Sequence, residues 1–189
     1  MNRREAISAV SILLGGTIVG ADLFLSGCKS PDTKVGEELT FDKDKIAFLD
    51  EIGETIIPAT NTPGAKAAKI GQYMQVIVKD CYEEKNQKIF MEGLTKINDA
   101  SKKKFDKSFM EADLKQRTAL LVELDNEQKK YMKKKKPNES SHYFRMLKEL
   151  TLLGYFTSEI GCTQALRYVD VPTKYEGCVP YKKGDKAWA

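Results

Sequence analysis

Apolar residues recur at steps of three and four along most of the chain, and this spacing constrains the fold more than any other feature. Ile46, Leu49, Ile52 and Ile56 form one such face. Pro58 should end this helix, because proline lacks the amide hydrogen that the helical ladder needs. A strand would instead require strict alternation, and no alternating stretch is long enough for a sheet.

The same spacing predicts further helices joined by short loops. One should start at Gly64, and another should follow Ser108, which has capping-box spacing with Glu111. The longest, about 140–165, is apolar on most of its circumference and should be central and buried. The chain after residue 167 has no helical period. The predicted fold is therefore all-α, a compact helical bundle with an irregular, extended C-terminal tail.

The first residues have the organisation of an export signal. Arg3 and Arg4 precede a mildly apolar stretch, 7–25, as in twin-arginine signals. A membrane anchor is the alternative, but three glycines and Asp22 interrupt the stretch, and a spanning helix needs about 20 mainly apolar residues. The sequence Leu-Ser-Gly-Cys ending at Cys28 resembles a lipobox, which predicts acylation of that cysteine. A chance cysteine after a signal is the other interpretation.

These features divide the chain into three parts. Residues 1–27 are the predicted signal peptide, 28–41 a polar tether, and 42–189 a helical domain. Two or more acyl chains anchor a protein stably. We therefore expect an exported protein on the periplasmic side of a bacterial membrane, held there by its lipid.

The formal net charge is +4, and much of the basic character comes from lysines at 102–104 and 129–136. Such runs are usually solvated, and contact with anionic lipid or an acidic partner is the alternative. Nucleic-acid binding is not expected, because no aromatic residues are spaced through a basic groove.

The sequence contains no recognisable catalytic constellation, phosphate-binding loop or haem-attachment motif. The one histidine, His142, should be structural or lie on the surface, because a single histidine builds neither a metal site nor a triad. Glu159 is expected to be a buried carboxylate paired with Arg167, and catalytic use of this acid is the alternative. No catalytic, cofactor-binding or metal-binding residue is predicted in this chain.

The C-terminal segment is rich in aromatic residues interleaved with lysines. Tyrosine and tryptophan are favoured interface anchors because they bury much area and keep a polar group. The tail could bind a partner or pack back on its own bundle, and both interpretations stay open. Gly154 and Gly161 lie seven apart on one predicted helix face, where they permit a close approach. The predicted partner interface comprises Pro58, Pro63, Gly64, Gly154, Gly161, Tyr168, Tyr175, Tyr181 and Trp188.

Two long blocks and the twin-arginine start resemble one family. The blocks are LDEIGETIIPATNTPGAKAAKIG at 49–71 and LKELTLLGYFTSEIGCTQALRYVDVPTKYEGCVPY at 147–181. They are similar to the gluconate 2-dehydrogenase subunit 3 family over nearly the whole chain after the signal. Thr173 departs from the pattern, since a glycine is expected there after the proline.

The resemblance implies the small subunit of an exported, membrane-associated sugar or sugar-acid dehydrogenase. The large subunit of such complexes is a flavoprotein of the glucose–methanol–choline type, which holds FAD and the catalytic residues and passes electrons to a cytochrome c or another acceptor. The small subunit often carries the only twin-arginine signal. A self-contained lipoprotein that binds a ligand or acts as a scaffold is the competing interpretation, and the identity of the neighbouring gene would distinguish the two.

Three cysteines remain if Cys28 is acylated, and the residues alone allow any pairing among Cys81, Cys162 and Cys178. We favour Cys81–Cys178, because this disulfide would join the irregular tail to an early helix. The resemblance favours the same pair through the D-C-Y and E-G-C contexts.

Overall fold

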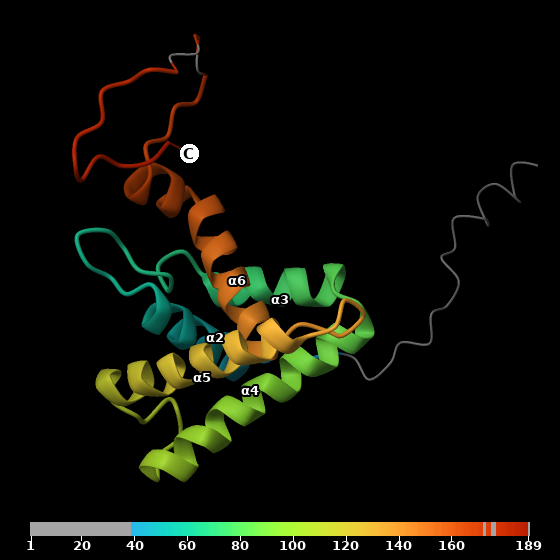
Figure 1. The fold of residues 1–189 in the computed structure, drawn as a ribbon. Coiled ribbons are helices and arrows are strands. Elements are labelled where there is room, and N and C mark those ends of the chain that lie inside the picture. Colours follow the sequence, from blue (N-terminus) through green and yellow to red (C-terminus); the bar gives the residue numbers. More distant parts are fainter. Residues whose placement is uncertain (1–38, 172, 175–176, 189) are drawn as a thin grey trace, which may run out of the picture. The chain divides into compact units, whose positions relative to one another are not determined.

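The computed structural model describes residues 39–171, 173–174 and 177–188, and the compact unit that contains the helices spans 40–189. Within these described residues, five α-helices and one short π-helix follow one another (Figure 1). Among the described residues, the only β-type pairing is a single bridge between Arg167 and Trp188. The prediction of an all-α bundle with an irregular tail is confirmed. The elements are α2 (Lys43–Ile56), α3 (Ile70–Cys81), α4 (Glu84–Phe105), α5 (Leu114–Lys134), α6 (Tyr143–Thr157) and η1 (Gly161–Ala165).

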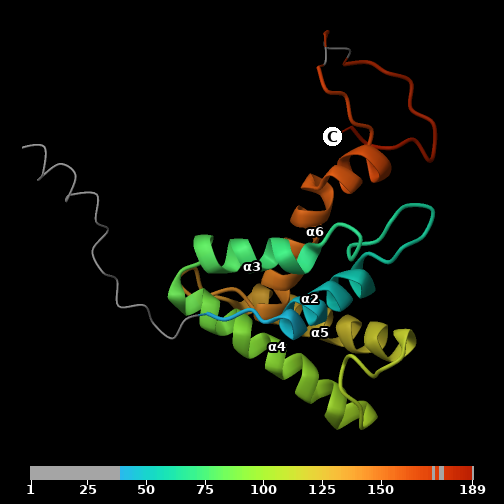
Figure 2. The ribbon, with the colours of Figure 1, turned by 180° about the vertical axis from the view of Figure 1, so that it is seen from behind.

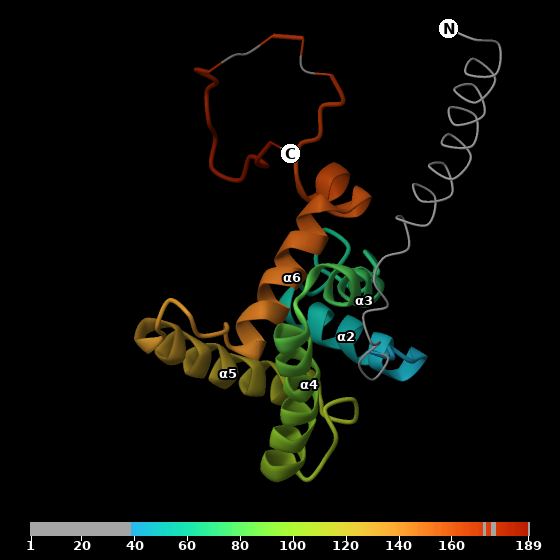
Figure 3. The ribbon, with the colours of Figure 1, turned by 90° about the vertical axis from the view of Figure 1, so that its right-hand side faces the viewer.

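Helix α6 is the centre of the bundle. It contacts each of the other four α-helices, and Figure 3 shows it crossing between α5 and α3. Apolar or small residues cover several of its sides, which confirms the predicted central, buried helix. The α6 residues with little exposure are Tyr143, Phe144, Met146, Leu147, Leu150, Thr151, Gly154 and Tyr155.

The prediction that this helix continues to residue 165 is wrong. α6 ends at Thr157, because Ser158 adopts an extended backbone with ψ of 157°. The Ser158 hydroxyl donates to the Tyr155 carbonyl at 2.7 Å and accepts from the Gly161 amide at 3.0 Å. The chain then turns so tightly that a Cβ on Gly161 would overlap the Tyr155 carbonyl. The glycine therefore permits a bend rather than a straight helix.

The start of α3 also differs from the prediction. The helix begins at Ile70 rather than at Gly64, because Lys69 adopts the left-handed conformation with φ of 55°. Residues 65–69 form turns closed by Ala68 N–H to Ala65 O and Lys69 N–H to Lys66 O. Apolar periodicity does not register such a turn, since it contains three alanines and two lysines.

The helix ends follow local chemistry. Asp42 caps α2 by accepting from the Lys45 amide at 2.8 Å, and the helix ends before Pro58 as predicted. Helix α5 is capped by Asp113 and Gln116, which form a reciprocal capping box. Ser108 and Glu111 do bond to each other, but they close a separate turn ahead of the helix.

Arg117 fixes this turn to the rest of the bundle. Its guanidinium donates to the carbonyls of Phe109, at 2.9 Å, and Met110, at 2.6 Å, and it pairs with Glu51 on α2. Phe109 is fully buried and meets the ring of Phe48 edge-on at 5.4 Å. One partly buried arginine on α5 thus bonds both to α2 and to the turn that precedes α5.

Asp125 on α5 ties that helix to α6. Its carboxylate lies 2.6 Å from Lys129 Nζ and 2.7 Å from Lys148 Nζ, and it accepts from Gln128 at 3.1 Å. Burial alone would raise the pKa of Asp125, but the hydrogen bonds from Lys129, Lys148 and Gln128 outweigh it and lower the pKa to about 2.

The Asp125→Asn variant should therefore be less stable than the natural chain by about 2 kcal/mol at pH 7. A carboxylate with a lowered folded-state pKa stabilises the fold above its ordinary pKa of 3.8, and this stabilisation is lost as the pH falls toward 2. Urea unfolding at pH 7 and near pH 2.5 measures the difference, which should shrink at the lower pH. An equal difference at both values would contradict the assignment.

Candidate partner interface

The acids of the 49–57 segment hold the loop between α2 and α3. Glu54 accepts from the amides of Ala59, at 2.8 Å, and Lys66, at 2.9 Å. A Cβ on Gly64 would overlap the Glu54 carboxylate, so glycine lets the loop close over this acid without displacing its side chain. The loop is therefore built around one carboxylate, a role that the sequence analysis did not assign.

Helix α6 supports the same loop from the other side. Tyr155, 2% exposed, donates its hydroxyl to the Pro63 carbonyl at 2.6 Å. Figures 1 and 2 both show the loop beside the C-terminal half of α6. Gly64 is buried, Pro63 is half-buried, and Pro58 is exposed with residues 59–61. The exposed part of the loop is thus held at a fixed place beside α6.

Two further acids on α2 bond to neighbouring segments. Asp50 accepts from the Gly71 amide at 2.7 Å, and burial raises its pKa. Glu51 lies 2.9 Å from Lys66 Nζ and pairs with Arg117. Burial opposes ionisation of Glu51, yet hydrogen bonds from both cations lower its pKa. The acids of this block therefore act within the chain.

The glycines of α6 and η1 make close approaches inside the molecule. Gly154 is buried, and a Cβ there would lie 2.5 Å from Cδ1 of Tyr73 on α3. Gly161 meets the backbone of Tyr155, as described above. Their participation in a partner interface stays a prediction. Three apolar side chains in the last turns of α6 are also exposed, and apolar spacing did not predict this: Leu152 (39% exposed), Leu153 (54%) and Phe156 (41%).

The tail closes on itself through its last residues. The Arg167 amide donates to the Ala187 carbonyl at 2.7 Å, and the Arg167 guanidinium lies 4.6 Å from the centre of the Trp188 ring. Lys186 also donates to the Gln164 carbonyl in η1. The tail therefore returns to the end of η1, and Figure 3 shows the resulting loop.

This arrangement corrects the expected ion pair. Glu159 is exposed rather than buried, because the bend at Ser158 turns the chain out of the helix in which we placed it. Arg167 stacks on Trp188 instead of pairing with Glu159. Because Glu159 is exposed, it is not a buried carboxylate and does not need a buried partner.

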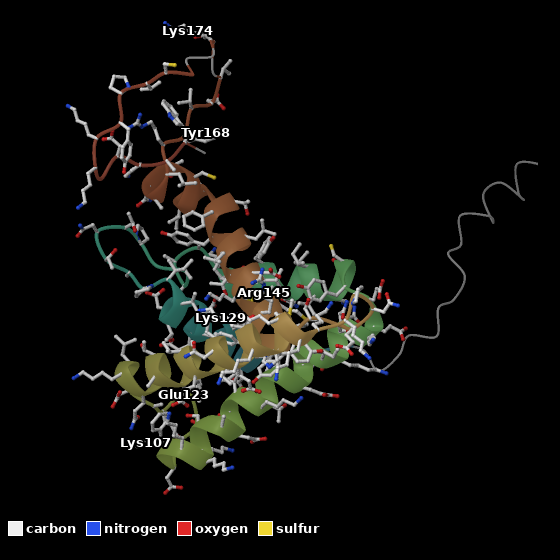
Figure 4. All side chains as sticks on the ribbon, in the orientation of Figure 1. Lys107, Glu123, Lys129, Arg145, Tyr168 and Lys174 are labelled. Carbon is white, nitrogen blue, oxygen red and sulfur yellow. The ribbon has the colours of Figure 1, made fainter. Side chains whose placement is uncertain are left out.

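The tail exposes several aromatic and aliphatic side chains. Tyr181 is 76% exposed and Trp188 57%, and Figure 4 shows Tyr168 beyond the end of α6. Tyr175 lies outside the described residues. A large exposed apolar surface is typical of a site that binds another protein. We call the following set the docking surface: Pro58, Leu152, Leu153, Phe156, Tyr168, Val169, Val171, Tyr181 and Trp188.

The three described cysteines are free thiols in the structure. Cys81 ends α3 and Cys178 lies in the tail, and both are exposed. Cys162 is partly covered and its Sγ lies 3.2 Å from the Phe156 carbonyl. The structure does not form the predicted Cys81–Cys178 disulfide, which stays a prediction. Cys28, Arg3 and Arg4 lie outside the described residues.

His142 has a structural role, as expected. Its Nδ1 accepts from the Phe144 amide at 3.2 Å and caps α6, and its Nε2 lies 3.7 Å from Glu127. Burial lowers its pKa below the ordinary value, although Glu127 opposes the shift. No group of three or more histidine, cysteine or acidic residues in the described part of the chain could hold a metal ion. Within that part, no helix has the length and apolar content of a membrane span.

An all-helical domain with internally paired acids and exposed apolar side chains has features typical of a protein that associates with others. The model of the gluconate 2-dehydrogenase subunit 3 family matches residues 43–173, from the first residue of α2 into the tail. The chain belongs to this family and is an accessory subunit of a dehydrogenase complex. No curated protein and no solved structure matches it.

Proposed function

We propose that this chain is the non-catalytic small subunit of an exported, membrane-associated, FAD-dependent sugar or sugar-acid dehydrogenase. Its role is to aid the export, maturation and anchoring of the catalytic flavoprotein subunit. The observation that carries the proposal is the family match, which covers every helix of the described part of the chain. The docking surface at the end of α6 and in the tail gives the partner a place to bind.

The export and anchoring roles both rest on the N-terminal part of the chain. The twin-arginine start, Arg3 and Arg4, would export the folded partner as a passenger. Acylation of Cys28 would then hold the complex on the periplasmic side of a bacterial membrane. The partner, of the glucose–methanol–choline type, would hold FAD and oxidise the sugar, and its electrons would pass to a cytochrome c or another acceptor.

The isolated chain should therefore show no flavin absorbance and should reduce no dye with any sugar. Co-expression with the catalytic subunit is the control, because the purified complex should show both flavin absorbance and dye reduction. An absorption spectrum and a dye-reduction assay on each sample measure the difference. Stoichiometric FAD on the isolated chain would contradict the proposal.

A further inference from the structure

The C-terminal tail is closed at its base by contacts between residues that are far apart in the sequence. The Arg167 amide donates to the Ala187 carbonyl, and the Arg167 guanidinium stacks on the Trp188 ring. The Lys186 ammonium donates to the Gln164 carbonyl in η1. We call these five residues the clasp. A backbone bond, a ring contact and a side-chain bond thus join the last residues of the tail to its beginning.

The tail between the two sides of the clasp has no core of its own. No described residue from 168 onward is buried. The hydrogen bonds from Tyr168 to Asp170 and from the Lys182 amide to Asp185 join residues that are close in sequence. Because the hydrophobic effect stabilises a segment only where side chains leave water, the shape of the tail depends on the contacts that close it.

The clasp also connects the tail to α6. The Cys162 amide of η1 donates to the Ser158 carbonyl at 2.8 Å, so η1 is bonded to the residue that ends α6. Lys186 holds the tail to Gln164 of the same η1. Figure 3 shows the closed loop beyond η1. The two parts of the docking surface, on α6 and in the tail, are therefore joined through η1.

We propose that the clasp holds the tail as a closed loop before the catalytic subunit binds, with Arg167 as its positioning residue. The inference rests on the proposed function, in which that subunit binds the docking surface. A segment that is ordered before binding loses less conformational entropy when it binds, so its affinity is higher. Trp188 is 57% exposed, and it therefore stacks on Arg167 and still presents surface to a partner.

Trp188 is the only tryptophan of the chain, so its fluorescence reports the clasp in the isolated full-length protein. Arg167→Gln removes the stacked guanidinium. Lys183→Gln is the matched control, because it removes the same charge from the tail at an exposed residue outside the clasp. Quenching by acrylamide should be stronger with Arg167→Gln and unchanged with Lys183→Gln. Equal quenching of the two variants would overturn the inference.

Competition for the catalytic subunit measures the effect on binding. The purified complex is incubated with a variant chain that carries a different tag, and the ratio of the two chains on the catalytic subunit at equilibrium gives their relative affinity. Arg167→Gln should bind about two- to fivefold more weakly, as expected for one exposed cation–π contact, and Lys183→Gln should bind like the natural chain. Equal binding by the two variants would contradict the inference. Loss of the helical circular dichroism signal in Arg167→Gln would also contradict it, because Arg167 would then support the bundle rather than the tail.

A second background shows whether Arg167 acts through Trp188. On Trp188→Leu, which removes the ring, Arg167→Gln should cause no further loss of affinity, because the two residues act as one unit. An undiminished loss would show that Arg167 contacts the catalytic subunit directly, and the inference would be wrong. If the natural chain does not co-purify with the catalytic subunit, the proposed function fails and the inference with it. If it does co-purify and Arg167→Gln competes equally well, the inference alone fails.

Discussion

Truncation after Val169 is expected to abolish co-purification of the catalytic subunit and, with it, that subunit's export. The truncation removes Val171, Tyr181 and Trp188, all more than half exposed, and it leaves Arg167 without its stacking partner. Buried aromatic anchors can each contribute 2 kcal/mol or more to binding, and every 1.4 kcal/mol is tenfold in affinity, so the loss should be at least about a hundredfold. Affinity purification from cells that co-express both chains measures the retained partner.

The matched control replaces the four lysines at 133–136 with serine. This run ends α5 and lies outside the docking surface, so both co-purification and export should stay nearly intact. Circular dichroism must show that both variants remain helical, because a truncated chain that unfolds says nothing about binding. Loss of the partner in the lysine variant, with retention in the truncated one, would show electrostatic docking and refute the placement.

The Gly71→Ala variant is expected to lose about 3 kcal/mol of folding stability or more. A Cβ at this position would overlap the backbone carbonyl of Ile46, and a backbone atom cannot move aside as a side chain can. The same shift would also strain the 2.7 Å hydrogen bond from the Gly71 amide to Asp50. The midpoint and slope of urea unfolding measure the loss.

Gly53→Ala is the control for this prediction, because Gly53 packs at the same α2–α3 contact. Its Cβ would meet Ala65 Cβ at 3.4 Å and Ile70 at 3.6 Å, which is ordinary van der Waals contact. Alanine is also favoured over glycine inside a helix by roughly 1 kcal/mol. The Gly53→Ala chain should therefore be as stable as the natural one or more so. Equal destabilisation by both substitutions would contradict the assigned geometry.

The sequence predicted the helical bundle well, because apolar spacing reports the buried faces directly. It placed α2 between Asp42 and Pro58 and identified α6 as the central helix. The errors lie where the backbone departs from a helix without an apolar signal. The left-handed Lys69 makes α3 begin later in the sequence than predicted. Hydrogen bonds of the Ser158 hydroxyl end α6, and serine gives no clear signal for this because it also occurs inside helices.

The site was predictable only in part. Surplus aromatics pointed to the tail, where Tyr168, Tyr181 and Trp188 are indeed exposed. The exposed Leu152 and Leu153 were missed, because nearly continuous apolar spacing hides which side of a helix has no neighbour. The role of Glu54 was also missed, since it depends on the amides of residues 59 and 66, which only the folded loop brings to one carboxylate.

We propose that this chain delivers a catalytic flavoprotein out of the cytoplasm, and one localisation experiment tests this role most directly. The variant replaces Arg3 and Arg4 with lysine, and the FAD content and dehydrogenase activity of the periplasmic and membrane fractions are compared with those of the natural chain. The catalytic subunit should stay in the cytoplasm with its FAD, and dehydrogenase activity should disappear from the exported fractions. Full export of an active catalytic subunit beside the variant would contradict it.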